Sequence, residues 1–162
     1  MIRTATEQDL DRIETICNQA IHDGFKTARL TPMGMEARYK WFHHYDRNTY
    51  PIFVFEENGI VMGWVSLSPY REGREALDET AVISYFVDFD CLGRGIGSQL
   101  IDHVIHHLPD QIKAVFAIII DGNDASIHLL KKFGFEQWGL LPGVYNAMGE
   151  VRDQVYYGKL FR

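Results

Sequence analysis

Three glycines at alternate positions, Gly93, Gly95 and Gly97, follow the apolar run SYFV and precede an apolar segment with helical periodicity. The run predicts the end of a strand, and the segment predicts the start of a helix. Backbone N–H groups at a helix N-terminus bind phosphate, and glycines let such a ligand approach the main chain closely. The pattern therefore predicts a pyrophosphate cradle in this loop, to which the guanidinium of Arg94 would add a charge-assisted contact.

Other interpretations fit the loop less well. A P-loop needs a lysine followed by serine or threonine after its last glycine, whereas Ser98 and Gln99 follow here. A dinucleotide-binding G-x-G-x-x-G motif needs a third glycine where Ser98 stands, and residues 88–92 separate the glycines from the strand. A loop that binds nothing is also disfavoured, because each glycine at a helix start costs about 1 kcal/mol relative to alanine.

The elements that position this loop follow from hydrophobic periodicity, capping residues and turn residues. Their order, β-α-α-β-β-β-α-β-α-β-β, predicts an α/β (α+β) fold with a mixed, mainly antiparallel central sheet and helices on both faces. No repeat or linker interrupts residues 1–162, which are expected to form a single domain. The expected elements are a strand at 2–5, helices at 10–22 and 31–46, a hairpin at 51–67, a loop at 70–79, a strand at 80–88, a helix at 95–108, a strand at 114–121, a helix at 123–133, and two strands around a Pro142-Gly143 turn.

Composition narrows the class of protein. A chain of 162 residues with 46% hydrophobic and 23% charged residues is typical of one globular domain. A net charge of −6 argues against a nucleic-acid partner, and no apolar run approaches the roughly 20 residues of a membrane span. The start, MIRTATEQDL, has no signal-peptide pattern, and two distant cysteines, Cys17 and Cys91, fit a reducing compartment. We expect a cytoplasmic protein without a nucleic-acid or membrane partner.

The segments CLGRGIGSQLIDHVI and NDASIHLLKKFGF resemble the two sequence motifs of the GNAT N-acetyltransferase superfamily. RTATEQDL, TAVISYFV and EQWGLLPGV extend the similarity to its phosphinothricin or methionine-sulfoximine acetyltransferase branch. The resemblance implies a homodimeric enzyme that transfers acetyl from acetyl-coenzyme A to the amine of a small acceptor, such as an amino acid or an analogue. A non-catalytic sensor of acetyl-coenzyme A and a protein N-acetyltransferase remain the alternatives.

The resemblance also implies where the cofactor lies. The pyrophosphate would sit on the glycine loop, and the pantetheine would run between the strand ending at Val87 and the strand ending near Asp121, splayed apart in this fold. Asn123 would hydrogen-bond the pantetheine arm, although a helix N-cap explains this residue equally well. The implied cofactor-binding residues are Phe86, Val87, Gly93, Arg94, Gly95, Ile96, Gly97, Ser98, Asn123 and Ser126.

Acetyl transfer needs an amine that loses a proton, a donor for the developing oxyanion, and an acid for the leaving thiolate. Three polar positions of the family are apolar here: Val82 stands in place of a glutamate, Leu130 of a tyrosine, and Leu92 of a glutamine or arginine. Tyr85, on the strand beside the cofactor, and Glu79, three residues before Val82, are the candidate catalytic replacements.

Charged residues elsewhere suggest two further sites. Arg71 and Arg74, in the 70–79 loop, could clamp the carboxylate of an amino-acid acceptor, or could be solvated partners of the loop's own acidic residues. His103, His106 and His107 lie on one predicted helix at i, i+3 and i+4 spacing, and two of them could hold a metal. No third ligand is suggested nearby, so we expect no metal site.

Overall fold

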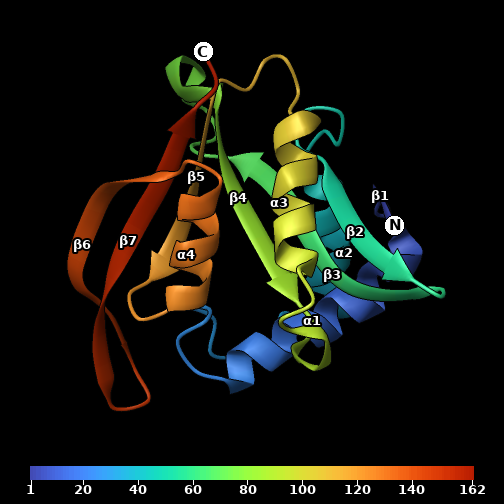
Figure 1. The fold of residues 1–162 in the computed structure, drawn as a ribbon, viewed down its shortest axis with the longest axis horizontal. Helices are drawn as coiled ribbons and strands as arrows, with labels where there is room; N and C mark the ends of the chain where they lie inside the picture. The colour runs from blue at the N-terminus through green and yellow to red at the C-terminus, as the bar shows by residue number, and fades with distance from the viewer.

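The computed structural model describes residues 1–162 as one seven-stranded sheet in the order β1-β2-β3-β4-β5-β7-β6, in which only β4 and β5 run parallel. The expected order of elements and the mixed sheet are confirmed (Figure 1). None of the helices combines the length and the apolar character that crossing a membrane requires. The strands are β1 (Ile2–Thr4), β2 (Ile52–Glu57), β3 (Ile60–Pro69), β4 (Thr80–Val87), β5 (Ala114–Ile120), β6 (Glu136–Ala147) and β7 (Glu150–Leu160), and the helices are α1 (Leu10–His22), α2 (Met35–His44), α3 (Ile96–His106) and α4 (Asp124–Lys132).

Helices cover both faces of the sheet because side chains alternate along its strands. On β3, a Cβ at Gly63 would meet Ile96 and Leu100 of α3, whereas Trp64 packs in a cluster with residues of α1. The α3 and α4 side holds the larger apolar core, and the α1 and α2 side holds a smaller one (Figure 1). The two faces of β3 and β4 are therefore distinct environments, one for each helix pair.

The sheet opens between its two parallel strands. Pairing of β4 with β5 begins at Thr80 opposite Ala114 and ends at Val82 opposite Phe116. Beyond this point the strands diverge, as Figure 1 shows, and the second half of β4 keeps only β3 as a neighbour. The splay that the resemblance implied is present, and it leaves the facing edges of β4 and β5 unpaired beyond Val82 and Phe116.

The predicted turn at Pro142-Gly143 is wrong. Strand β6 continues through it to Ala147, and the reversal occurs at Met148 and Gly149, which both have positive φ, 54° and 76°. Because β6 is the edge strand of the sheet, a proline costs it no ladder hydrogen bond. The Pro142-Gly143 pair instead falls within an irregularity of the β6–β7 register, where Gly143 has φ 64°.

The second helix also begins later than the expected position 31. Helix α2 starts at Met35, after Gly34, whose φ of 82° only glycine adopts readily. The Gly34 N–H donates to Glu14 Oε1 at 3.1 Å. This bond to α1 holds the preceding segment out of the helix.

Candidate active site

The glycine loop forms a turn with unpaired amides at the start of α3. Gly93 and Gly95 both have φ 76°, and no atom lies within 4 Å of a Cβ built on either. Both are thus required by backbone conformation rather than by crowding. No N–H from Gly93 to Ser98 has a backbone acceptor, and the first that does, on Gln99, donates to the Gly95 carbonyl at 3.1 Å. These free N–H groups, at the positive end of the helix dipole, suit an anion.

The third glycine of the loop has a different role. A Cβ at Gly97 would lie 3.1 Å from Leu129 Cδ2, so its absence lets the first turn of α3 pack against α4. Gly63 acts likewise on β3, where a Cβ would lie 3.1 Å from Ile96 Cγ2. Gly97 therefore also serves helix packing, while its N–H stays free in the loop and its place in the cradle stays a prediction.

A cavity of about 470 Å³ continues from this loop into the gap between β4 and β5. Its wall includes Ser84 and Phe86, whose side chains point to the α1 face, and Tyr85, which points to the α4 face. Every implied cofactor-binding residue except Arg94 lines it. The cavity thus joins the free amides on one face of the sheet to the opposite face.

Comparison with known proteins identifies the family. The model of the acetyltransferase (GNAT) family matches residues 13–135. The chain belongs to this family. It is similar to YwnH of Bacillus subtilis, provisionally named as a phosphinothricin acetyltransferase, with 34% identity over 160 residues, 98% of this chain and 97% of that protein. It is also similar to an L-methionine sulfoximine/L-methionine sulfone acetyltransferase of Pseudomonas paraeruginosa, with 33% identity over 157 residues, 96% and 91% of the two chains.

The fold comparison agrees. The structure of yncA from Salmonella typhimurium with its cofactor acetyl-CoA superposes with a TM-score of 0.93 at 26% identity, covering 100% of this chain and 94% of that one. The protein is therefore an acetyl-coenzyme A-dependent N-acetyltransferase.

Tyr85 is the one tyrosine in the lining of the cavity. Its hydroxyl lies 3.5 Å from the Ser126 carbonyl oxygen, to which it donates. Burial raises the pKa of Tyr85 to about 12, and the contact with Ser126 offsets only part of that effect. The phenol is therefore protonated at neutral pH and can donate a proton but not accept one.

Asn123 is a helix cap, and it also lies in the cavity wall. Its side-chain oxygen accepts a hydrogen bond from the Ser126 N–H at 3.4 Å and caps α4. The same residue lines the cavity, where its side-chain NH₂ remains available to a ligand.

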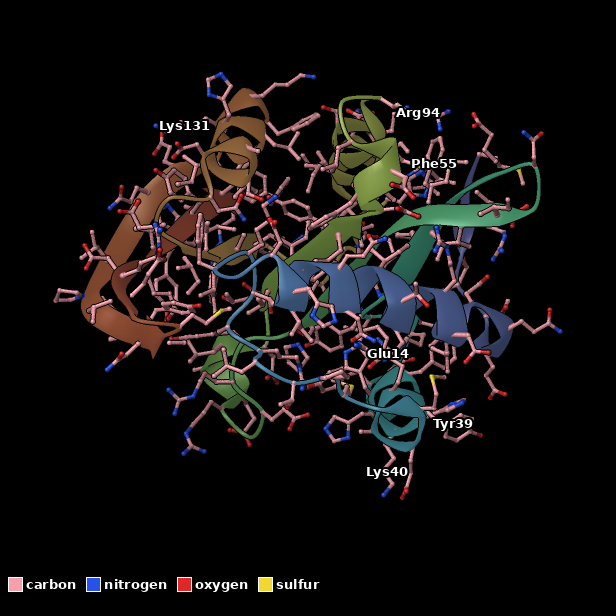
Figure 2. All side chains as sticks on the ribbon, turned by 90° about the horizontal axis from the view of Figure 1, so that it is seen from below. Glu14, Tyr39, Lys40, Phe55, Arg94 and Lys131 are labelled. Carbon is pink, nitrogen blue, oxygen red and sulfur yellow. The ribbon has the colours of Figure 1, made fainter.

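Arg94 points away from the cavity. Its Nη2 lies 2.6 Å from Glu57 Oε2 on the β2–β3 hairpin, and Figure 2 shows it on that side of the molecule, near Phe55. The structure therefore gives the predicted phosphate contact of Arg94 no support. The loop offers amides, not a guanidinium.

Three other candidate residues lie outside the cavity. Glu79 precedes β4, where Arg162 Nη2 is 3.3 Å from Glu79 Oε2, and it borders a separate polar pocket. Arg71 and Arg74 are exposed in the neighbouring loop and line no part of the cavity. The prediction of Glu79 as a catalytic residue is corrected, because on this strand the cavity begins three residues later, at Val82. The carboxylate clamp stays a prediction that the geometry does not support.

A buried polar network that the sequence did not reveal holds the turn before the glycine loop. The Asp88 carboxylate accepts from Arg12 Nη2, from Gln19 Nε2 at 3.1 Å and from the Asp90 N–H at 2.9 Å. Gln19 Oε1 in turn accepts from the Phe89 N–H at 2.9 Å. Two side chains of α1 thereby fix the backbone that leads into the cradle.

Lys26 is a further residue of the site that sequence reasoning missed. It follows α1, lines the cavity, and its Nζ lies 4.8 Å from the centre of the Phe89 ring. An ion pair joins it to Asp23 at 2.8 Å. No sequence signal marks it, because nothing in its local spacing shows which surface the segment after α1 faces.

Proposed function

We propose that this acetyltransferase transfers acetyl from acetyl-coenzyme A to the amine of a small acceptor of the amino-acid type. The observation that carries the proposal is the cavity that passes through the sheet and joins the free amides at α3 to the α1 face. A donor held on one face can thus present its acyl group to an acceptor on the other. The named substrates of the relative from Pseudomonas paraeruginosa, methionine sulfoximine and methionine sulfone, support an amino-acid-like acceptor.

The cavity has the chemistry that acetyl-coenzyme A requires. The N–H groups of residues 93–98 would hold its diphosphate, and Asn123 with the unpaired edge of β4 would hold its pantetheine amides. The remaining wall is mostly apolar and suits the alkyl portions of the arm.

Two protein groups support the transfer itself. The acceptor nitrogen forms a bond to the acyl carbon while the carbon–sulfur bond breaks. The Tyr85 hydroxyl supplies the proton for the departing thiolate and regains one, through water, from the proton that the acceptor amine releases. Backbone N–H groups of β4 that face the gap stabilise the developing oxyanion. No carboxylate lines the cavity, so the acceptor amine loses its proton to water.

We also propose that the protein acts as a cytoplasmic homodimer. Edge strand β6, the turn that follows it and strand β7 expose large apolar side chains, including Leu140 (46%), Met148 (69%) and Val151 (66%). An apolar edge strand of this kind is favourable to cover with a second copy. Both cysteines are free and buried, as a reducing compartment permits. Sedimentation at micromolar concentrations tests the dimer, and a monomer would contradict it.

The activity is tested by thiol release on a panel of amino acids, amino-acid analogues and a peptide with a free N-terminus, with calorimetric titration of acetyl-coenzyme A. We expect turnover on at least one free amino acid or analogue and none on the peptide. Gly95→Glu should abolish binding, because a carboxylate would occupy the cradle. Gly59→Glu is the matched control, since Gly59 also has positive φ (77°) and open space around it. Tight binding without turnover on any amine would contradict the enzymatic proposal for this panel.

A further inference from the structure

Lys26 is the only charged residue in the lining of the cavity. Apart from it, the lining comprises apolar residues, glycines, serines, Tyr85 and Asn123. A diphosphate carries a full negative charge on each phosphate, whereas helix amides offer only partial positive charge. Within the lining, Lys26 is thus the one residue that can supply a full countercharge.

The other nearby cations are engaged outside the lining. Arg94 pairs with Glu57, and Lys132 Nζ donates to Ser98 Oγ at 3.2 Å on the exposed surface of α3 and α4. Neither lines the cavity, although the bond to Ser98 places the Lys132 ammonium at the outer side of the cradle.

The position of Lys26 favours the cradle end of the cavity. Its ammonium lies over Phe89, whose N–H is bonded to Gln19 and which stands four residues before Gly93. The backbone of Phe89 is held in place, because the Asp88 carboxylate before it accepts hydrogen bonds from Arg12 and from the Asp90 N–H after it. An ammonium over this ring therefore lies against the segment that leads into the loop.

The present partner of Lys26 is easily exchanged. Asp23 is three residues away, and both side chains are more than one-third exposed, at 36% and 45%. Exposed pairs of this kind contribute little to stability, and a lysine stem reorients readily. A diphosphate in the cradle would compete well for the ammonium.

We propose that Lys26 binds the diphosphate of acetyl-coenzyme A and is a cofactor-binding residue, not an acceptor-binding one. The inference rests on the proposed function. It means that the segment after α1, on the acceptor side of the sheet, also contributes to donor binding.

The test compares Lys26→Met with Lys26→Arg and with Lys40→Met. Lys40 is a matched control, since it too pairs with an acidic residue nearby in sequence, Glu36 at 3.0 Å. Figure 2 shows Lys40 pointing outward from α2. Two donors are used: acetyl-coenzyme A, and S-acetylpantetheine, which lacks the diphosphate. Dissociation constants come from calorimetry at two salt concentrations, and KM values for each substrate come from thiol release.

For Lys26→Met we expect about tenfold weaker binding of acetyl-coenzyme A and a shallower salt dependence. The KM for the acceptor and the KM for S-acetylpantetheine should not change, and Lys26→Arg should restore most of the affinity. Lys40→Met should match the wild type.

Two results would overturn the inference while leaving the proposed function intact. One is a raised KM for the acceptor with unchanged affinity for acetyl-coenzyme A. The other is an equal loss with S-acetylpantetheine. If the wild-type protein binds no acetyl-coenzyme A, the proposed function fails first, and the inference fails with it.

Discussion

Replacing Asp88 with alanine should both destabilise the protein and weaken its binding of acetyl-coenzyme A. The substitution removes a buried carboxylate that accepts three hydrogen bonds, from Arg12, Gln19 and the Asp90 N–H. The bonds from Gln19 and Asp90 contribute about 1 kcal/mol each. Arg12 is 32% exposed, so its partly solvated charge adds about 1–2 kcal/mol rather than the larger cost of a fully buried pair. The expected loss in the free energy of unfolding is about 3–4 kcal/mol.

Asp88→Asn separates the charge from the geometry. Its side-chain oxygen can still accept from Gln19 and Asp90, so only the contribution of Arg12, about 1–2 kcal/mol, should be lost. Asp11→Ala, an exposed change on α1, should stay within about 0.5 kcal/mol of the wild type.

Urea unfolding measures the stability, and calorimetry measures the affinity for acetyl-coenzyme A. At about 2–4 °C per kcal/mol, the alanine variant should melt roughly 10 °C lower. Its affinity for the donor should fall more than that of the asparagine variant, because the turn before the cradle loses its support. An alanine variant destabilised by less than about 1 kcal/mol would refute the assigned network.

The other predictions concern the acid, the helix contact and a buried thiol. Tyr85→Phe should lower kcat by about a hundredfold in thiol-release assays while the KM for acetyl-coenzyme A stays the same; a raised KM with normal kcat would contradict the acid role. Because burial raises the pKa of Tyr85 to about 12, above the value near 10 of a free phenol, its stabilising contribution is complete below about pH 10 and is lost as the pH rises towards 12. Urea titrations should therefore show a smaller loss of stability above about pH 10 in Tyr85→Phe than in the wild type. Gly97→Ala should cost about 1–2 kcal/mol in the same urea titration, since its Cβ would lie 3.1 Å from Leu129, and an unchanged midpoint would argue against close packing there. Burial raises the pKa of Cys17 to about 11, so iodoacetamide at pH 8 should label this thiol only after unfolding, as mass spectrometry would show.

Local signals in the sequence predicted local structure correctly. The Asn58-Gly59 pair predicted a tight hairpin turn, and both residues have positive φ, 53° and 77°. The asparagine at 123 predicted a helix start, and its side chain does cap α4. Such signals succeed because a turn or a cap depends on a few consecutive residues.

The sequence could not predict which distant residues meet in the fold or which pocket a side chain faces. Pro142-Gly143 has the composition of a turn, yet its position on an edge strand lets the strand continue. Arg12 and Asp88 are 76 residues apart, so no spacing rule could pair them. Glu79 lies close to Val82 in sequence, but the strand carries the two towards different pockets.

The divergence of β4 from β5 has a consequence for amide hydrogen exchange. In most sheets the central strands exchange most slowly and the edges fastest. Here the central strands β4 and β5 each have backbone groups without a strand partner on the side that faces the gap, since their ladder stops at Val82 and Phe116. Amides in the second half of β4 that face the gap should therefore exchange faster than those of β3 in the free protein. Their slowing upon addition of acetyl-coenzyme A would trace the path of the donor through the middle of the sheet, residue by residue.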